Sequence, residues 1–146
     1  MWLKDTHSTI SVSNMEKSLA FYRDLLGMKV RVEPKLYQPD ESMDKIFNMK
    51  GASFYYAQLD YDDSYVIEIL EWVSPRARIP ATPNANDLGF HWQCIYQTDV
   101  EGTYRRLKAA GVKFVSEPVM LGGGTIPDVF CLDPDGNWVE IHPPRQ

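Results

Sequence analysis

The sequence predicts an α+β fold built from two copies of one unit, in which a strand and a helix are followed by about three further strands. Two observations predict it. A strand followed by a helix with a capping motif occurs twice, in residues 8–30 and in residues 95–114. Each copy also has a histidine near its start and a glutamate inside an apolar strand near its end. The chain therefore reads as a tandem repeat.

The first copy begins with an alternating strand and continues into a helix. Ser13 and Glu16 have the S-x-x-E spacing of a capping box, and Gly27 follows the last apolar residue of the helical stripe. Residues 35–51 have no counterpart in the second copy, and their apolar residues have helical spacing. We expect a short inserted helix there, which covers either a sheet edge or a ligand site. The segment YVIEILEW, residues 65–72, is the last strand of this copy.

The second copy repeats these signals in the same order. Thr98 and Glu101 form the same capping box, and Gly111 ends the helical pattern. The segment LDPDGN, residues 132–137, predicts a turn between two strands because proline presets φ and Asp-Gly suits a tight hairpin. The copy ends in the strand-like segment NWVEIH.

The two copies define the predicted organisation of the chain. At 146 residues it has the size of one ordinary domain. Module one covers about residues 5–72 and module two about residues 89–142. The prolines and small polar residues of 73–88 are typical of a linker. We expect one domain, residues 1–146, made of both modules.

Composition limits the function further. The 44% hydrophobic and 24% charged fractions and the lack of a long apolar run or signal peptide predict a cytoplasmic protein with no membrane partner. The net charge of −5, without a basic run, argues against nucleic acid and favours a small-molecule substrate. Cys94 and Cys131 lie in apolar runs without metal or redox spacing, so we expect both to be core residues.

Four residues raise a specific hypothesis. Glu68 and Glu140 each stand in the middle of an apolar strand, where a carboxylate needs a cation, a hydrogen-bond donor or a proton nearby. His7 and His91 each precede the helix of their module. If the modules pair about a pseudo-two-fold axis, the four side chains converge on one cavity. Two imidazoles and two carboxylates suit a divalent transition metal.

These residues also carry a family resemblance. The stretches HSTISVSNMEKSLAFYRDLLGMKV, VIEILEW and DPDGNWVEI resemble the vicinal oxygen chelate superfamily, which includes glyoxalase I, extradiol dioxygenases and bleomycin resistance proteins. The resemblance implies a glyoxalase-like domain whose two βαβββ modules form a curled mixed sheet around a metal cavity. It implies metal ligation by His7, Glu68, His91 and Glu140, with Ni, Zn, Co, Mn or Fe as the metal. It also implies a homodimer.

One match to the family pattern is imperfect. Family members usually place the second histidine where this chain has Trp92, so that His91 stands one residue early. Either Trp92 replaces a ligand, or an extra residue near Gln97 restores the phase through a bulge. Strand periodicity favours the bulge, because the other phase would bury Gln93 beneath the helix. We therefore expect His91 to face the cavity.

The resemblance also implies a reaction. With four protein ligands, the chain is most similar to a metal-dependent lyase or isomerase that acts on a small oxygen-rich substrate through a metal-stabilised enediolate. Glu68 or Glu140 would serve as the catalytic base. A non-haem Fe(II) dioxygenase that uses His7, His91 and Glu140 is the main alternative. A binding protein without catalysis, as in bleomycin resistance, is a further one.

Overall fold

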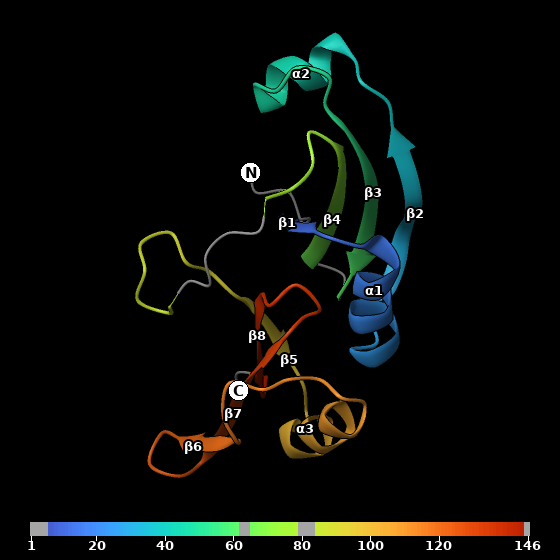
Figure 1. The fold of residues 1–146 in the computed structure, drawn as a ribbon. Coiled ribbons are helices and arrows are strands. Elements are labelled where there is room, and N and C mark those ends of the chain that lie inside the picture. The colour runs from blue at the N-terminus through green and yellow to red at the C-terminus, as the bar shows by residue number, and fades with distance from the viewer. Residues whose placement is uncertain (1–5, 62–64, 79–83, 145–146) are drawn as a thin grey trace, which may run out of the picture. The chain divides into compact units, whose positions relative to one another are not determined.

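The chain divides into two compact units, residues 1–79 and 80–146, in the computed structural model (Figure 1). The structure describes residues 6–61, 65–78 and 84–144. The predicted start of module one at residue 5 and the middle of the predicted linker, residues 79–83, lie outside the described residues.

Unit one contains one four-stranded mixed sheet with helices. Its elements are β1 (Thr6–Val12), α1 (Met15–Leu19), the π-helical η1 (Ala20–Leu25), β2 (Lys29–Tyr37), α2 (Glu41–Phe47), β3 (Ser53–Asp60) and β4 (Tyr65–Ser74). The strand order is β1-β4-β3-β2, with β1 parallel to β4 and the other neighbours antiparallel. The helix α1 packs against β4.

Unit two repeats this arrangement with shorter strands. Its elements are β5 (Gln93–Tyr96), α3 (Val100–Ala109), β6 (Val119–Leu121), β7 (Ile126–Leu132) and β8 (Trp138–His142). The order β5-β8-β7-β6, with β5 parallel to β8, matches the order in unit one. The predicted α+β class with two βαβββ modules is therefore confirmed. None of the helices in the described ranges is long and apolar enough to cross a membrane.

Both predicted helix starts are wrong by one residue. The N-cap of α1 is Asn14, whose side chain accepts a hydrogen bond from the Lys17 N–H, and the N-cap of α3 is Asp99, which accepts from Gly102. In each case the cap follows the Ser or Thr that sequence reasoning chose. Adjacent residues compete for one cap, and in both modules the Asn or Asp side chain accepts a hydrogen bond from the N–H three residues ahead.

The predicted helix ends and the inserted helix are confirmed. Gly27 and Gly111, with φ of 81° and 86°, follow the helical residues of the two modules in the left-handed conformation that glycine adopts without strain. The inserted helix is α2, which begins after Asp40. Its Phe47 ring contacts the rings of Phe54 and Trp72, at centroid distances of 5.6 and 5.1 Å. The helix thus covers aromatic side chains of the sheet.

The core of unit one lies on one face of its sheet. Ile67 and Ile69 of β4 are fully buried, as are their register partners Leu59 and Ala57 on β3. The buried residues of α1 and η1 complete this core; they are Met15, Ser18, Leu19, Phe21 and Tyr22. Because side chains alternate along a strand, Glu68 points to the opposite face of β4.

Unit two has a corresponding core beneath α3. Ile95, Val139 and Ile141 are fully buried on the sheet, and Leu107 is fully buried on the helix. Cys131 belongs to the same layer as the register partner of Val139. The prediction of a core residue is therefore confirmed for Cys131, whereas Cys94 is only half-buried.

The buried thiol of Cys131 is expected to react slowly with alkylating reagents. Burial raises the pKa of its thiol to about 12, so that almost no reactive thiolate is present at neutral pH. We expect one fast-reacting thiol when the native protein is treated with iodoacetamide at pH 8, and two after denaturation. A Cys94→Ser variant should lose the fast thiol. Rapid alkylation of native Cys94→Ser would contradict the buried position of Cys131.

Candidate metal centre

The first half of the candidate site lies on the face of β4 that carries Glu68. In the sheet register Glu68 stands opposite Thr9 on β1 and opposite Gln58 on β3. Its Oε1 atom accepts hydrogen bonds from the Tyr56 hydroxyl at 2.9 Å and from Gln58 Nε2 at 2.8 Å. Its Oε2 atom accepts one from Thr9 Oγ1 at 3.0 Å. Three side chains therefore orient this carboxylate.

His7 lies beside Glu68 on the same face. It stands two residues before Thr9 on β1, so the two side chains point the same way. Its Nε2 atom is 3.6 Å from Glu68 Oε2, and 57% of its side chain is exposed, against 17% for Glu68. The structure thus brings together two of the four predicted ligands, one imidazole nitrogen and one carboxylate oxygen. An accessible imidazole nitrogen next to a carboxylate is a donor pair that suits a divalent metal.

The surroundings keep Glu68 ionised. Burial alone would raise the pKa of its carboxyl, but the hydrogen bonds from Gln58, Tyr56 and Thr9 and the charge of His7 outweigh burial and hold this pKa below its usual range. Burial and the neighbouring carboxylate raise the pKa of the Tyr56 hydroxyl, which stays protonated as a donor. Glu68 is therefore an anion at neutral pH, as a metal ligand must be.

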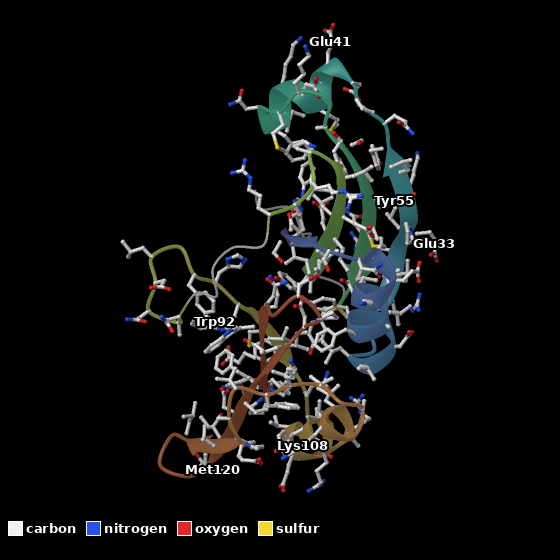
Figure 2. The ribbon with its side chains drawn as sticks, viewed as in Figure 1. Glu33, Glu41, Tyr55, Trp92, Lys108 and Met120 are labelled. Atoms are coloured by element: carbon white, nitrogen blue, oxygen red, sulfur yellow. The ribbon has the colours of Figure 1, made fainter. Side chains whose placement is uncertain are left out.

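The second half of the candidate site lies in unit two, around Glu140 on β8. Glu140 stands opposite Cys94 on β5 and opposite Phe130 on β7. Its Oε2 atom accepts a hydrogen bond of 2.7 Å from the indole Nε1 of Trp92. Trp92, labelled in Figure 2, comes from the segment just before β5 and is 44% exposed. Glu140 is thus bonded by a tryptophan, where sequence reasoning expected a histidine neighbour.

The registers of the two sheets show that Trp92, not His91, corresponds to His7. In both units the relevant residue stands two positions before the one that faces the glutamate: His7 in unit one and Trp92 in unit two. Gln93, which the expected phase placed in the cavity, is 4% exposed on the core face. The expected bulge near Gln97 is therefore wrong. The parallel pairing of β5 with β8 decides the phase, because a one-residue shift would turn every side chain of β5 to the other face.

Sequence reasoning missed two residues of this half-site, Asp128 and His142. Asp128 is 3% exposed, and its Oδ2 atom lies 3.9 Å from His142 Nε2. Burial, then the hydrogen bond to Glu140 and its charge, raise the pKa of Asp128 to about 6, while His142 acts in the opposite direction. The sequence contained the signal, since Asp128 stands inside the apolar strand segment IPDVFCL as Glu68 stands inside its own strand.

The predicted ligands therefore form two partial sites. His7 and Glu68 are together in unit one, while Glu140 belongs to unit two and contacts Trp92 and Asp128. Within the described ranges, no group of three or more His, Cys, Asp and Glu side chains could hold a metal ion. The convergence of all four predicted ligands remains a prediction.

Comparison with known proteins gives relatives along nearly the whole chain. The chain is 32% identical over 139 residues to a lactoylglutathione lyase of Neisseria meningitidis, in an alignment that covers 92% of this chain and 86% of that protein. It is 30% identical over 141 residues to a lactoylglutathione lyase of Schizosaccharomyces pombe, covering 92% of this chain and 43% of the yeast protein. The chain thus spans less than half the length of the yeast relative.

Solved structures agree on the fold. A glyoxalase family protein of Bacillus cereus superposes with a TM-score of 0.85 at 16% identity, covering 98% of this chain and 95% of that one. Glyoxalase I of Zea mays superposes with a TM-score of 0.68 at 21% identity, covering 96% of this chain and 44% of that one. The family model of the Glyoxalase/Bleomycin resistance protein/Dioxygenase superfamily matches residues 6–141. The chain therefore belongs to this superfamily.

Proposed function

We propose that the protein is a divalent-metal-dependent lyase or isomerase of the glyoxalase type, with a small oxygen-rich compound as substrate. The observation that carries the proposal is the pair of His7 Nε2 and Glu68 Oε2, 3.6 Å apart, with the pKa of Glu68 lowered. The 32% identity to a lactoylglutathione lyase supports this reaction class. His7, Glu68 and Glu140 would hold the metal, and the variants below test whether His91 joins them.

Glu68 and Glu140 have different roles in this proposal. A bound divalent metal would polarise a substrate carbonyl and so acidify the neighbouring C–H bond. Both oxygens of Glu68 already accept hydrogen bonds from protein donors, which hold this carboxylate in one orientation. Glu140 accepts a hydrogen bond from the Trp92 indole on Oε2 and shares another with the buried Asp128. Because three donors hold Glu68 in place, we assign ligation in a fixed position to Glu68 and proton abstraction from carbon to Glu140.

The Fe(II) dioxygenase is the alternative within the same superfamily. It requires two histidines and a carboxylate on the metal, which would be His7, His91 and Glu140. In unit two it is Trp92 rather than His91 that stands in the register position of His7 and bonds Glu140. This observation favours the lyase or isomerase over the dioxygenase, because the lyase proposal depends less on a second histidine.

Metal binding and turnover test the proposal together. The protein is purified without a metal-chelating tag, its metal content is determined, and the metal-free form is titrated with Ni²⁺, Zn²⁺ and Fe²⁺. We expect one ion per chain and metal-dependent isomerisation of the glutathione adduct of a 2-oxoaldehyde to the corresponding 2-hydroxyacyl thioester. Tight metal binding without turnover would restrict the conclusion to a metal centre. Absence of metal binding near neutral pH would refute the enzyme and favour a binding protein.

A matched pair of histidine variants tests the fourth ligand. His91→Gln weakens metal binding only if His91 coordinates the ion. His142→Gln serves as the control, since this other histidine contacts Asp128 and the Pro143 carbonyl. Because the register places His91 one residue away from the equivalent of His7, we expect less than about a threefold change in metal affinity for either variant. A larger loss in His91→Gln alone would establish His91 as a ligand.

A further inference from the structure

An aromatic cluster lies next to Glu140 in unit two. Four aromatic side chains form the cluster, and the ring of each one contacts the rings of two others. Their centroid distances are 6.2 Å for Phe90–Trp92, 5.6 Å for Trp92–Phe130, 5.4 Å for Phe130–Trp138 and 5.3 Å for Trp138–Phe90. None of the four side chains is classed as buried, and Trp92 is 44% exposed. Three half-buried rings and the exposed Trp92 together leave apolar aromatic surface accessible to a ligand.

The cluster is continuous with the candidate site. Phe130 is the register partner of Glu140, and Trp138 stands two residues before Glu140 on the same face of β8. The Trp92 indole both belongs to the cluster and donates to Glu140 Oε2. A ligand whose oxygen atoms reach Glu140 would therefore have these rings beside it, with the polar pair of Asp128 and His142 further along the same strands.

Unit one shows the same combination independently. The Tyr56 hydroxyl donates to Glu68, and the Tyr56 ring contacts Tyr37 with centroids 5.5 Å apart. Tyr37 stacks on Phe54, also at 5.5 Å, and Phe54 contacts Trp72 at 5.1 Å. In each unit the candidate glutamate thus accepts a hydrogen bond from one member of an aromatic cluster. The recurrence associates aromatic surface with both carboxylates.

We infer that the substrate carries an aromatic ring directly next to its paired oxygen atoms, and that the cluster of Phe90, Trp92, Phe130 and Trp138 binds this ring. The inference rests on the proposed function, because it assigns the substrate class of the same site. The oxygen pair lies toward Glu140 and the ring lies against Trp92. Aliphatic compounds with the same oxygen pair bind more weakly, because they leave the rings exposed to water.

Mandelate and lactate form a matched pair of probes for this inference. Both are 2-hydroxy acids with neighbouring oxygen atoms, and they differ in a phenyl ring in place of a methyl group. The metal-loaded protein is titrated with each by calorimetry, and tryptophan fluorescence is recorded. We expect mandelate to bind at least about tenfold more tightly than lactate and to change the fluorescence.

Three variants locate the effect. Trp138→Leu removes a ring of the cluster and leaves the Trp92 indole donor to Glu140 in place, whereas Trp92→Leu removes both the ring and this donor. We expect each to bring the two affinities within about twofold. Tyr55→Leu is the control. Tyr55, labelled in Figure 2, is 39% exposed, and the register of β3 with β4 places it on the strand face opposite Glu68. It should preserve the preference for mandelate.

The outcomes separate this inference from the proposed function. If metal binds but mandelate and lactate bind equally, or neither binds, the inference is overturned while the metal centre stands. If the protein binds no metal but still binds mandelate more tightly than lactate, the aromatic site stands and the proposed function fails. If mandelate does not bind and Trp138→Leu instead converts a dimer to a monomer in sedimentation, the rings serve a second copy of the chain and the inference is overturned.

Discussion

Replacing Glu68 by alanine is expected to weaken metal binding at least about 100-fold. Changes in residues that only support metal ligands typically cost 10–100-fold in affinity, and removal of a ligand costs more. The variant removes the carboxylate that lies 3.6 Å from His7 and that three donors hold in place. Calorimetric titration of the metal-free protein with Ni²⁺ or Zn²⁺ measures the change.

Two further variants make this result specific. Glu33→Ala is the control, because Glu33 is an exposed glutamate on the edge strand β2 (Figure 2), and it should bind metal as the unchanged protein does. His7→Ala should weaken binding by a similar factor. Circular dichroism of all three variants reports whether the fold is intact. Unchanged affinity in a folded Glu68→Ala would exclude Glu68 as a ligand.

Trp92→His is expected to strengthen metal binding by roughly 100-fold. Trp92 stands in unit two where His7 stands in unit one, and its side chain already reaches Glu140 at 2.7 Å. An imidazole there would add a nitrogen donor beside the carboxylate. The lost indole bond to Glu140 acts in the other direction, but a metal ion bound to Glu140 replaces that partner.

The position of the new histidine can be checked within the same sheet face. Trp138→His is the matched control, because Trp138 lies on the Glu140 face while Trp92 is the tryptophan that bonds this carboxylate. It should leave metal affinity within about threefold of the original value. A loss of affinity in Trp92→His would show that the indole supports Glu140 and that position 92 does not face the metal.

The alternation and caps of the sequence were sufficient to predict the fold. Apolar residues spaced by two or by three and four mark strands and helices wherever local preference and burial agree, and glycines such as Gly27 and Gly111 mark helix ends. The cap residue itself was predicted one position early in both modules. Ser13 and Asn14 are both good caps, and only the position of the first helical N–H groups distinguishes them.

The candidate site was predicted in part. Glu68 could be identified because a carboxylate in an apolar strand needs partners, and His7 because it starts the same unit; the structure brings these two together. The partners themselves, Tyr56 and Gln58, could not be predicted. They lie 12 and 10 residues away in sequence, and the antiparallel register of β3 with β4 determines which side chains stand beside Glu68.

The sequence by itself determined the repeated βαβββ units, the inserted helix and the unusual carboxylates within apolar strands. Each of these depends on local periodicity or on the cost of burying a charge, which residue types alone express. Only the tertiary structure decided that Trp92, rather than His91, accompanies Glu140 and that Asp128 joins them. The reason is that strand register is a long-range property. A shift of one residue leaves the local sequence pattern almost equally satisfied, but it exchanges every side chain between the core and the site.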